Sequence, residues 1–138
     1  MNECDHRSEQ LAGLTGPKFH FPIELGKVRE FANALFSYHP AYHGDIHPVV
    51  PPTFPVVAGY LWGYILENAT GDNPLAAVDI NPHLSLDAEQ EYLYYAIPPR
   101  AGNQLVAETR VDRVWAKQGR RGGTLTFYRT VTDYRDRD

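Results

Sequence analysis

The apolar positions of the first third of the chain follow two different periods. The segment Lys18 to Ile23 (KFHFPI) alternates weakly, and Pro22 restricts it to the edge of a sheet because proline has no N–H to donate. Apolar residues then recur at spacings of three and four from Gly26 to Phe36, which predicts an amphipathic helix. The apolar stripe of this helix consists of Val28, Phe31, Ala32, Leu35 and Phe36. Pro40 ends the pattern, and four prolines with one glycine predict an irregular loop from Ser37 to Pro52.

A longer apolar stretch, Thr53 to Leu66 (TFPVVAGYLWGYIL), has no polar side. Thr53 suits the N-cap of a helix, and Pro55 suits its first turn. A helix that is apolar on every side belongs in a protein interior, and this one is shorter than the ~20 residues that cross a bilayer. We therefore predict a helix that the rest of the domain surrounds.

The C-terminal half changes to the period of a strand. Three segments are rich in β-branched and aromatic residues: Glu89 to Ile97, Gln104 to Trp115 and Thr124 to Tyr134. In the second segment one face carries Leu105, Ala107, Thr109 and Val111. Proline and glycine separate the first two segments, and Gln118 to Gly123 (QGRRGG) separates the last two. Such short links are typical of hairpins, so we expect an antiparallel sheet in an α+β domain.

Composition narrows the class of protein. A chain of 138 residues with 43% apolar residues suits one globular domain, and a net charge of −4 argues against a nucleic-acid or anionic-membrane binder. The one cysteine, Cys4, excludes a disulfide framework and a cysteine-built zinc site. We find neither a membrane span nor a signal peptide, so we expect a cytoplasmic protein. We divide the chain into a flexible tail, residues 1–16, and a single domain, residues 17–138.

Four segments resemble the MaoC-like dehydratase N-terminal domain, also called the FAS1-like dehydratase family. They are GKVREFANA (Gly26 to Ala34), PPTFP (Pro51 to Pro55), LDAEQEYLYYAIPPRAGNQL (Leu86 to Leu105) and TFYRTVTDYRDRD (Thr126 to Asp138). The family includes the smaller subunits of heteromeric (3R)-hydroxyacyl-thioester dehydratases. The resemblance implies a hot-dog fold, in which a long antiparallel sheet wraps around the helix at Thr53 to Leu66. Another strand normally follows the last turn in this fold, so we expect a truncation at Asp138 that leaves the last strand out.

The resemblance also locates the family's catalytic pair, an Asp and a His just after the first helix. Dehydration needs a base for the proton α to the thioester and an acid for the departing hydroxide. In this chain the two positions are Ser37 and Tyr42, while Pro40 keeps its place. Serine gives up no proton near neutral pH, and tyrosine ordinarily does so only at about pH 10. The standard pair is therefore missing, as in a non-catalytic subunit whose partner supplies Asp and His.

The histidines of the same loop leave a displaced acid–base pair open. His43 or His47 would act with Asp45 or Asp87. His39, His43 and His47 are spaced four apart, as ligands on one helix face would be, but intervening prolines and a glycine break such a helix, so we expect no metal site. The remaining interpretation is a polar loop over the mouth of a pocket.

The resemblance places the acyl thioester at the entry of the buried helix, where backbone N–H groups polarise the thioester carbonyl. The candidate substrate-binding residues are Pro52, Thr53, Phe54, Gly59, Tyr92 and Tyr94. The two tyrosines line an acyl tunnel or fill a subunit interface.

Gly71 to Leu75 (GDNPL) looks like a hydratase motif, but it lies after the buried helix and no histidine follows, so we predict a turn. Arg120 and Arg121, in the last hairpin, are solvated or contact a carrier phosphate.

The leading hypothesis is a subunit of a 3-hydroxyacyl-thioester dehydratase or enoyl-thioester hydratase. The subunit would bind the acyl chain and stabilise a dimer, either a homodimer or a heterodimer with a catalytic MaoC-like partner. Its ligand would be a thioester of coenzyme A or of acyl carrier protein, with no cofactor, nucleic acid or membrane. The alternatives are a self-sufficient enzyme with the displaced pair and a non-enzymatic module that binds a small apolar ligand. A cone-shaped α+β barrel is the alternative fold, and it predicts no continuous helix from Thr53 to Leu66.

Overall fold

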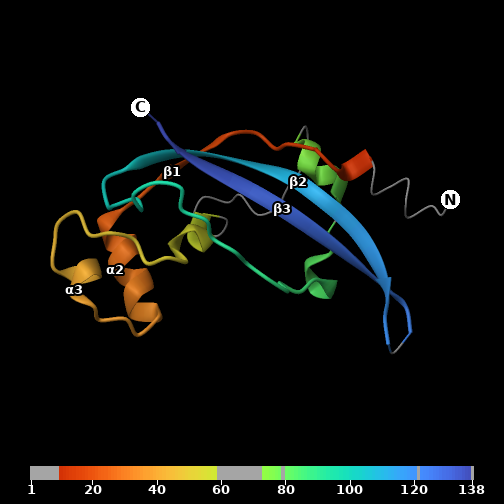
Figure 1. The fold of residues 1–138 in the computed structure, drawn as a ribbon, viewed down its shortest axis with the longest axis horizontal. Helices are drawn as coiled ribbons and strands as arrows, with labels where there is room; N and C mark the ends of the chain where they lie inside the picture. Colours follow the sequence, from red (N-terminus) through yellow and green to blue (C-terminus); the bar gives the residue numbers. More distant parts are fainter. Residues whose placement is uncertain (1–9, 59–72, 79, 121, 138) are drawn as a thin grey trace.

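A three-stranded antiparallel sheet is the central feature of the structure (Figure 1). The computed structural model describes residues 10–58, 73–78, 80–120 and 122–137. The strands are β1 (Phe19–Pro22), β2 (Gln104–Gln118) and β3 (Thr124–Asp136), in the order β1-β2-β3. β1 lies at an edge, as Pro22 requires. With the helices described below, this sheet confirms the α+β class.

The inner face of β2 is the one that the alternation predicts. Leu105, Ala107, Thr109 and Val111 are all buried. A bulge between Val111 and Arg113 then shifts the alternation by one residue, so that Val114 is the next buried residue. Beyond the bulge, Arg113 and Trp115 therefore belong to the outer face.

The register of β3 places Thr132 and Tyr134, both half-buried, on the same face as the buried residues of β2. Tyr134 pairs with Ala107, and Thr132 pairs with Thr109. The hydroxyls of Thr109 and Thr132 lie 2.8 Å apart and satisfy each other, which allows a polar residue in the buried row. Phe127 pairs with Trp115 on the opposite face.

Helix α2 (Leu25–Ala34) forms where the apolar stripe predicts it, but it ends two residues before Phe36. Val28 and Ala32 are fully buried. The Ser37 N–H donates to the Ala32 carbonyl at 2.9 Å, and Phe36 adopts a left-handed φ of 54°. This turn directs the chain away from the helix axis, so Leu35 and Phe36 are exposed rather than part of the buried stripe.

The loop from Ser37 to Pro52 contains a short helix, α3 (Pro40–His43), which the sequence did not predict. Pro40 occupies the first turn, where its missing N–H costs nothing. We had expected the prolines of this segment to exclude helical structure. That expectation was wrong, because Pro40 begins a helix.

Residues 10–16 pack along β2, although we expected them in a flexible tail. Leu11 is buried against Val111 and Val114. The N–H groups of Gly13 and Gly16 donate to the carbonyls of Val111 and Thr109, both at 2.8 Å. The ordered part of the domain therefore begins before residue 17.

The expected buried helix is described only at its beginning. A 3-10 turn, η1 (Phe54–Val56), leads into helical Val57 and Ala58. Thr53 is the N-cap residue, but its side chain makes no capping hydrogen bond. Residues 59–66 of the expected helix lie outside the described residues, and so does the candidate site residue Gly59.

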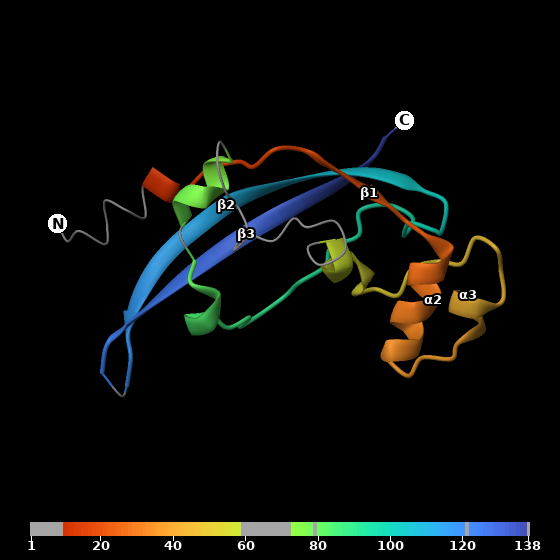
Figure 2. The ribbon, with the colours of Figure 1, turned by 180° about the vertical axis from the view of Figure 1, so that it is seen from behind.

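The expected strand from Glu89 to Ile97 is wrong, because no strand forms there. Two 3-10 turns, η3 (Pro74–Val78) and η4 (Pro82–Leu84), precede an extended segment that pairs with no described strand. Figures 1 and 2 both show it as a green-to-teal coil without a strand arrow, apart from the sheet. The side chains of Leu93, Tyr95 and Ile97 are exposed. Alternation alone does not make a strand, because a strand also needs a neighbour for its backbone hydrogen bonds.

Candidate functional site

The first two histidines of the loop, His39 and His43, both form hydrogen bonds to backbone atoms. The His39 Nδ1 accepts the Ala41 N–H at 3.1 Å and so caps α3. The His43 Nε2 lies 3.1 Å from the Ser37 carbonyl oxygen. Because a carbonyl only accepts, this nitrogen carries the hydrogen, and the bond ties the two ends of the turn together. Ser37 and Tyr42, where the resemblance led us to expect the family's catalytic pair, thus lie in a turn that His43 closes.

His47 is oriented differently. Its Nδ1 donates to the Ala101 carbonyl at 3.0 Å, and its own carbonyl accepts the Arg100 Nη1 at 2.9 Å. The Nδ1 hydrogen leaves Nε2 with the lone pair in the neutral ring. His47 therefore has the tautomer of an oriented base, on an exposed part of the loop.

Asp45 is committed to the backbone of the loop. Its Oδ1 accepts the N–H groups of Ile46 at 2.6 Å and of His47 at 3.2 Å. These bonds, first that from His47 and then that from Ile46, hold the pKa of the Asp45 carboxyl below its ordinary value of 3.8. The carboxylate therefore stays ionised at neutral pH and has no proton to donate.

Asp87 lies in the extended segment rather than in the histidine loop. Its charge acts on Tyr92 and contributes to the raised pKa of that phenol. No described hydrogen bond or ion pair joins Asp87 to His43 or His47. Asp45 thus accepts a hydrogen bond from the His47 N–H, whereas Asp87 lies near Tyr92.

Arg29 of α2 holds the loop from the helix side. Its Nη2 donates to the carbonyls of His43 at 3.3 Å and Asp45 at 3.1 Å. The Nε of Arg29 is buried without a partner among the described residues.

We expect Arg29→Met to lower the free energy of unfolding by about 1–3 kcal/mol, because two loop carbonyls lose a charged donor. Urea unfolding measures this loss, and hydrogen exchange should speed up at residues 43–47. Exposed Arg137→Met is the matched control and should change neither quantity. Equal effects of the two variants would show that Arg29 does not hold the loop.

Tyrosines gather around the entry of the expected helix. The Tyr94 hydroxyl donates to the Pro52 carbonyl at 2.8 Å, and the Tyr134 hydroxyl donates to the Pro55 carbonyl at 3.3 Å. The Tyr92 hydroxyl donates to Gln90 Oε1 at 2.7 Å. The candidate residues Pro52, Tyr92 and Tyr94 thus meet in one place, together with Tyr134.

Partial burial raises the pKa of these phenols above their ordinary value of 10.0, at which they are already neutral at pH 7. Desolvation is the main cause that raises the pKa of Tyr92, Tyr94 and Tyr134, and it raises that of Tyr134 most. The three groups also sense one another, because Tyr92 raises the pKa of Tyr94 and both raise that of Tyr134. The cluster therefore offers hydrogen-bond donors, and no base, at neutral pH.

Tyr134 is a member of this tyrosine cluster that the sequence interpretation did not include. The sequence indicates its position through the alternation of the last strand, which places Tyr134 on the same face as Thr130 and Thr132. That face lies toward the core, against Thr109 and Val111 of β2.

The pKa of Tyr134 predicts a loss of stability at alkaline pH. Its folded-state pKa lies above the ordinary value of 10.0, so the stability that the neutral phenol contributes is complete below pH 10.0 and falls as pH rises further. The slope is at most about 1.4 kcal/mol per pH unit. Urea unfolding at pH 7 and pH 11 should show a smaller loss for Tyr134→Phe than for the unaltered protein. Tyr95→Phe, at a residue 91% exposed, should follow the unaltered protein, and an unchanged loss in Tyr134→Phe would contradict the assignment.

The amides at the helix entry are already engaged. The Phe54 N–H donates to the Pro51 carbonyl at 2.9 Å, and the Val56 N–H donates to the Thr53 carbonyl at 3.1 Å. Phe54 itself is fully buried. The hydroxyls of Tyr94 and Tyr134 are likewise engaged, because each donates its one hydrogen to a backbone carbonyl.

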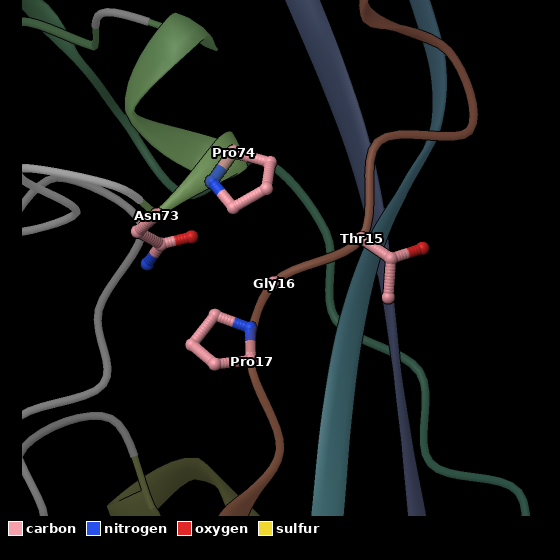
Figure 3. A pocket seen from close by; sticks show the side chains of 5 residues that line it. All are labelled: Thr15, Gly16, Pro17, Asn73 and Pro74. Atoms are coloured by element: carbon pink, nitrogen blue, oxygen red, sulfur yellow. The ribbon is translucent and has the colours of Figure 1, made fainter.

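An open pocket of about 430 Å³ lies elsewhere, between the segment Thr15 to Pro17 and the start of η3 (Figure 3). Asn73 and Pro74 line it, and the Asn73 Oδ1 accepts the Leu75 N–H at 3.0 Å. This bond agrees with the turn that we predicted for Gly71 to Leu75, of which Gly71 and Asp72 lie outside the described residues. Among the described residues, those that line the pocket carry no titratable side chain.

The described part of the chain contains neither a cluster of metal ligands nor a membrane-spanning helix. No three His, Cys, Asp or Glu side chains come together in a way that would hold a metal ion. No helix in this part has the length and apolar character to cross a membrane.

Comparison with known proteins identifies the class. The family model of the FAS1-like dehydratase domain region matches residues 10–138, so the chain belongs to that family. The fold is similar to the crystal structure of the C-terminally truncated HadBC (3R-hydroxyacyl-ACP dehydratase) complex from Mycobacterium tuberculosis. The TM-score is 0.51 at 19% identity, over 89% of this chain and 97% of the other. No curated protein matches the sequence. The chain is therefore a FAS1-like dehydratase domain with a hot-dog fold.

Proposed function

We propose that this domain is a subunit of a 3-hydroxyacyl-thioester dehydratase or enoyl-thioester hydratase. The subunit binds the acyl chain and stabilises a dimer, and a catalytic hot-dog partner supplies the Asp and His. The observation that carries the proposal is the turn after α2. It has Ser37 and Tyr42 where active relatives are expected to carry the acid and the base, and His43 closes it with a bond to the Ser37 carbonyl.

The tyrosine cluster supports a role in substrate binding. The hydroxyls of Tyr94 and Tyr134 lie at the helix entry near the buried ring of Phe54, and a substrate carbonyl would replace the Pro52 or Pro55 carbonyl as their acceptor. A cluster that donates hydrogen bonds but accepts no proton suits binding and polarisation of a carbonyl better than proton abstraction. The substrate-binding residues that we propose are Tyr92, Tyr94 and Tyr134 with Pro52, Thr53 and Phe54.

The exposed apolar side chains support association with a second hot-dog domain. Leu86, Leu93, Tyr95 and Ile97 project from the extended segment and are 94%, 61%, 91% and 87% exposed. Large apolar side chains gathered on one segment mark a surface that a partner covers. β3 also has no described neighbour beyond it, so its outer backbone groups are available for pairing.

Co-expression with a catalytic MaoC-like subunit from the same genome tests this association. We expect a stable heterodimer by light scattering after gel filtration, and we expect Leu93→Asp/Ile97→Asp to abolish it. Leu35→Asp/Phe36→Asp, which changes exposed apolar residues beside α2, is the control and should leave the heterodimer intact. Failure to associate with any catalytic hot-dog subunit would count against the proposal.

A second candidate is a self-sufficient enzyme that uses His47. The favouring observation is the bond from its Nδ1 to the Ala101 carbonyl, which leaves Nε2 as an oriented base. In this case the protein alone would hydrate an enoyl thioester, and His47→Ala would remove the activity. His20→Ala, at an exposed position of β1, is the matched control. Retention of activity in His47→Ala would exclude His47 as the base.

A further inference from the structure

The positive charge of this acidic protein is concentrated in one hairpin. Residues 112–129 contain five basic residues and one acid, Asp112, although the whole chain has 13 basic and 17 acidic residues. The rest of the chain therefore has eight basic and sixteen acidic residues. We refer to residues 112–129, the distal part of β2 and β3 with the turn between them, as the basic arm.

The outer face of the basic arm combines cations with a pair of aromatic rings. Trp115 and Phe127 stack at 5.2 Å with an angle of 8° between the rings. The Arg113 guanidinium lies 5.5 Å from the centre of the Trp115 ring, and the Lys117 ammonium lies 5.5 Å from that of Phe127. Arg129 is paired with Asp112, whereas the described ion pairs include neither Arg113 nor Lys117. The face thus has an apolar centre and an unneutralised basic rim, which is the usual composition of a protein-binding surface.

The position of the arm leaves this face accessible. The β2–β3 turn projects beyond the other elements, at the end of the long axis opposite α2 and α3, in both views (Figures 1 and 2). Arg113, Lys117 and Arg120 are exposed.

We propose that the basic arm is the docking surface for an acidic protein domain, the carrier on which a thioester substrate is attached. The identity of this carrier rests on the proposed function, whereas the charge complementarity does not. Arg113 and Lys117 lie four residues apart on one strand, a span of about 13 Å. That span is longer than one phosphate group and fits a row of carboxylates on a folded surface.

Nucleic acid fits the charge pattern less well than a small acidic protein does. A duplex carries a charge about every 1.7 Å and would continue past the arm onto the acidic remainder of the chain. A small domain contacts the arm alone, and its carboxylates meet the basic rim while its apolar residues meet Trp115 and Phe127.

Binding of apo-acyl carrier protein, which has the acidic surface but no thioester arm, tests the docking surface directly. Fluorescence anisotropy of the labelled carrier should show saturable binding that weakens as salt increases. R113E/K117E should raise the Kd at least about tenfold. K18E/R137E, which reverses two exposed charges outside the arm, is the matched control and should change the Kd less than about twofold.

Circular dichroism and the urea midpoint establish that both variants fold, and K117Q provides a milder substitution that should still weaken binding. Equal Kd values for the two double variants, or no binding of the carrier, would overturn the proposal. Tighter binding of a 24-base-pair DNA duplex than of the carrier, lost in R113E/K117E, would also overturn it and identify a nucleic-acid surface. Because apo-carrier takes no part in turnover, this assay reports on docking separately from the hydration assay that tests the proposed dehydratase function.

Discussion

Phe54→Ala should lower the free energy of unfolding by about 3–5 kcal/mol. Phe54 is fully buried, and its ring lies 5.5 Å edge-on from Phe31 of α2 and 6.0 Å from Phe21 of β1. Truncation removes apolar burial and leaves a cavity where the helix entry, α2 and β1 meet. Urea unfolding followed by circular dichroism measures the effect.

Phe36→Ala is the matched control, because it makes the same change at a side chain that is 81% exposed. We expect it to change the free energy of unfolding by less than about 0.5 kcal/mol. A comparable loss in both variants would mean that Phe54 does not link these three elements.

Gly102→Ala should lower the free energy of unfolding by about 1–3 kcal/mol. Gly102 has a φ of +98°, and an added Cβ would lie 3.3 Å from the His47 Nδ1. The substitution thus strains the backbone and crowds the ring that donates to the Ala101 carbonyl. In NMR spectra the His47 ring signals should shift.

Gly26→Ala is the control for the glycine substitution. Gly26 lies in α2, and its added Cβ would have no atom within 4 Å, so alanine should leave stability unchanged or raise it by up to about 1 kcal/mol. A loss in Gly26→Ala equal to that in Gly102→Ala would refute the argument from backbone conformation.

Local patterns predicted the elements whose environment they determine. The stripe that contains Val28 and Ala32 gave α2, and the alternation of Leu105 to Val111 gave the buried face of β2. Pro22 correctly indicated an edge strand, because the missing N–H acts at the residue itself. These features depend on spacing alone, and spacing is visible in the sequence.

Features that depend on distant partners were not predicted. Glu89 to Ile97 alternates like a strand, but no described strand lies beside it to complete a ladder. Gly13 and Gly16 look like tail residues, yet their N–H groups donate to β2 carbonyls almost one hundred positions away in the sequence. Pairing over such distances is set by the fold and leaves no local signal.

The residues of the candidate site likewise include some that the sequence indicated and others that only the structure placed. The resemblance to the family's motif assigned Ser37 and Tyr42 to the positions of the catalytic pair, and the absence of an acid–base pair there stays a prediction. The tyrosine cluster needed the structure, because Tyr94 and Tyr134 reach Pro52 and Pro55 from far along the chain. The bonds of His43 and His47 to carbonyls likewise depend on where the loop folds back.

If the proposed role is right, this domain needs a catalytic partner for turnover. Hydration of trans-2-enoyl thioesters, followed by loss of enoyl absorbance over short and long acyl chains, tests it most directly. We expect no turnover above background from the purified chain, and at least about a hundredfold increase over background when the catalytic hot-dog subunit is added, because general acid–base catalysis contributes about 10²–10⁴-fold. A variant of that partner without its Asp and His should restore nothing. Turnover by the chain alone, abolished in His47→Ala, would contradict the account.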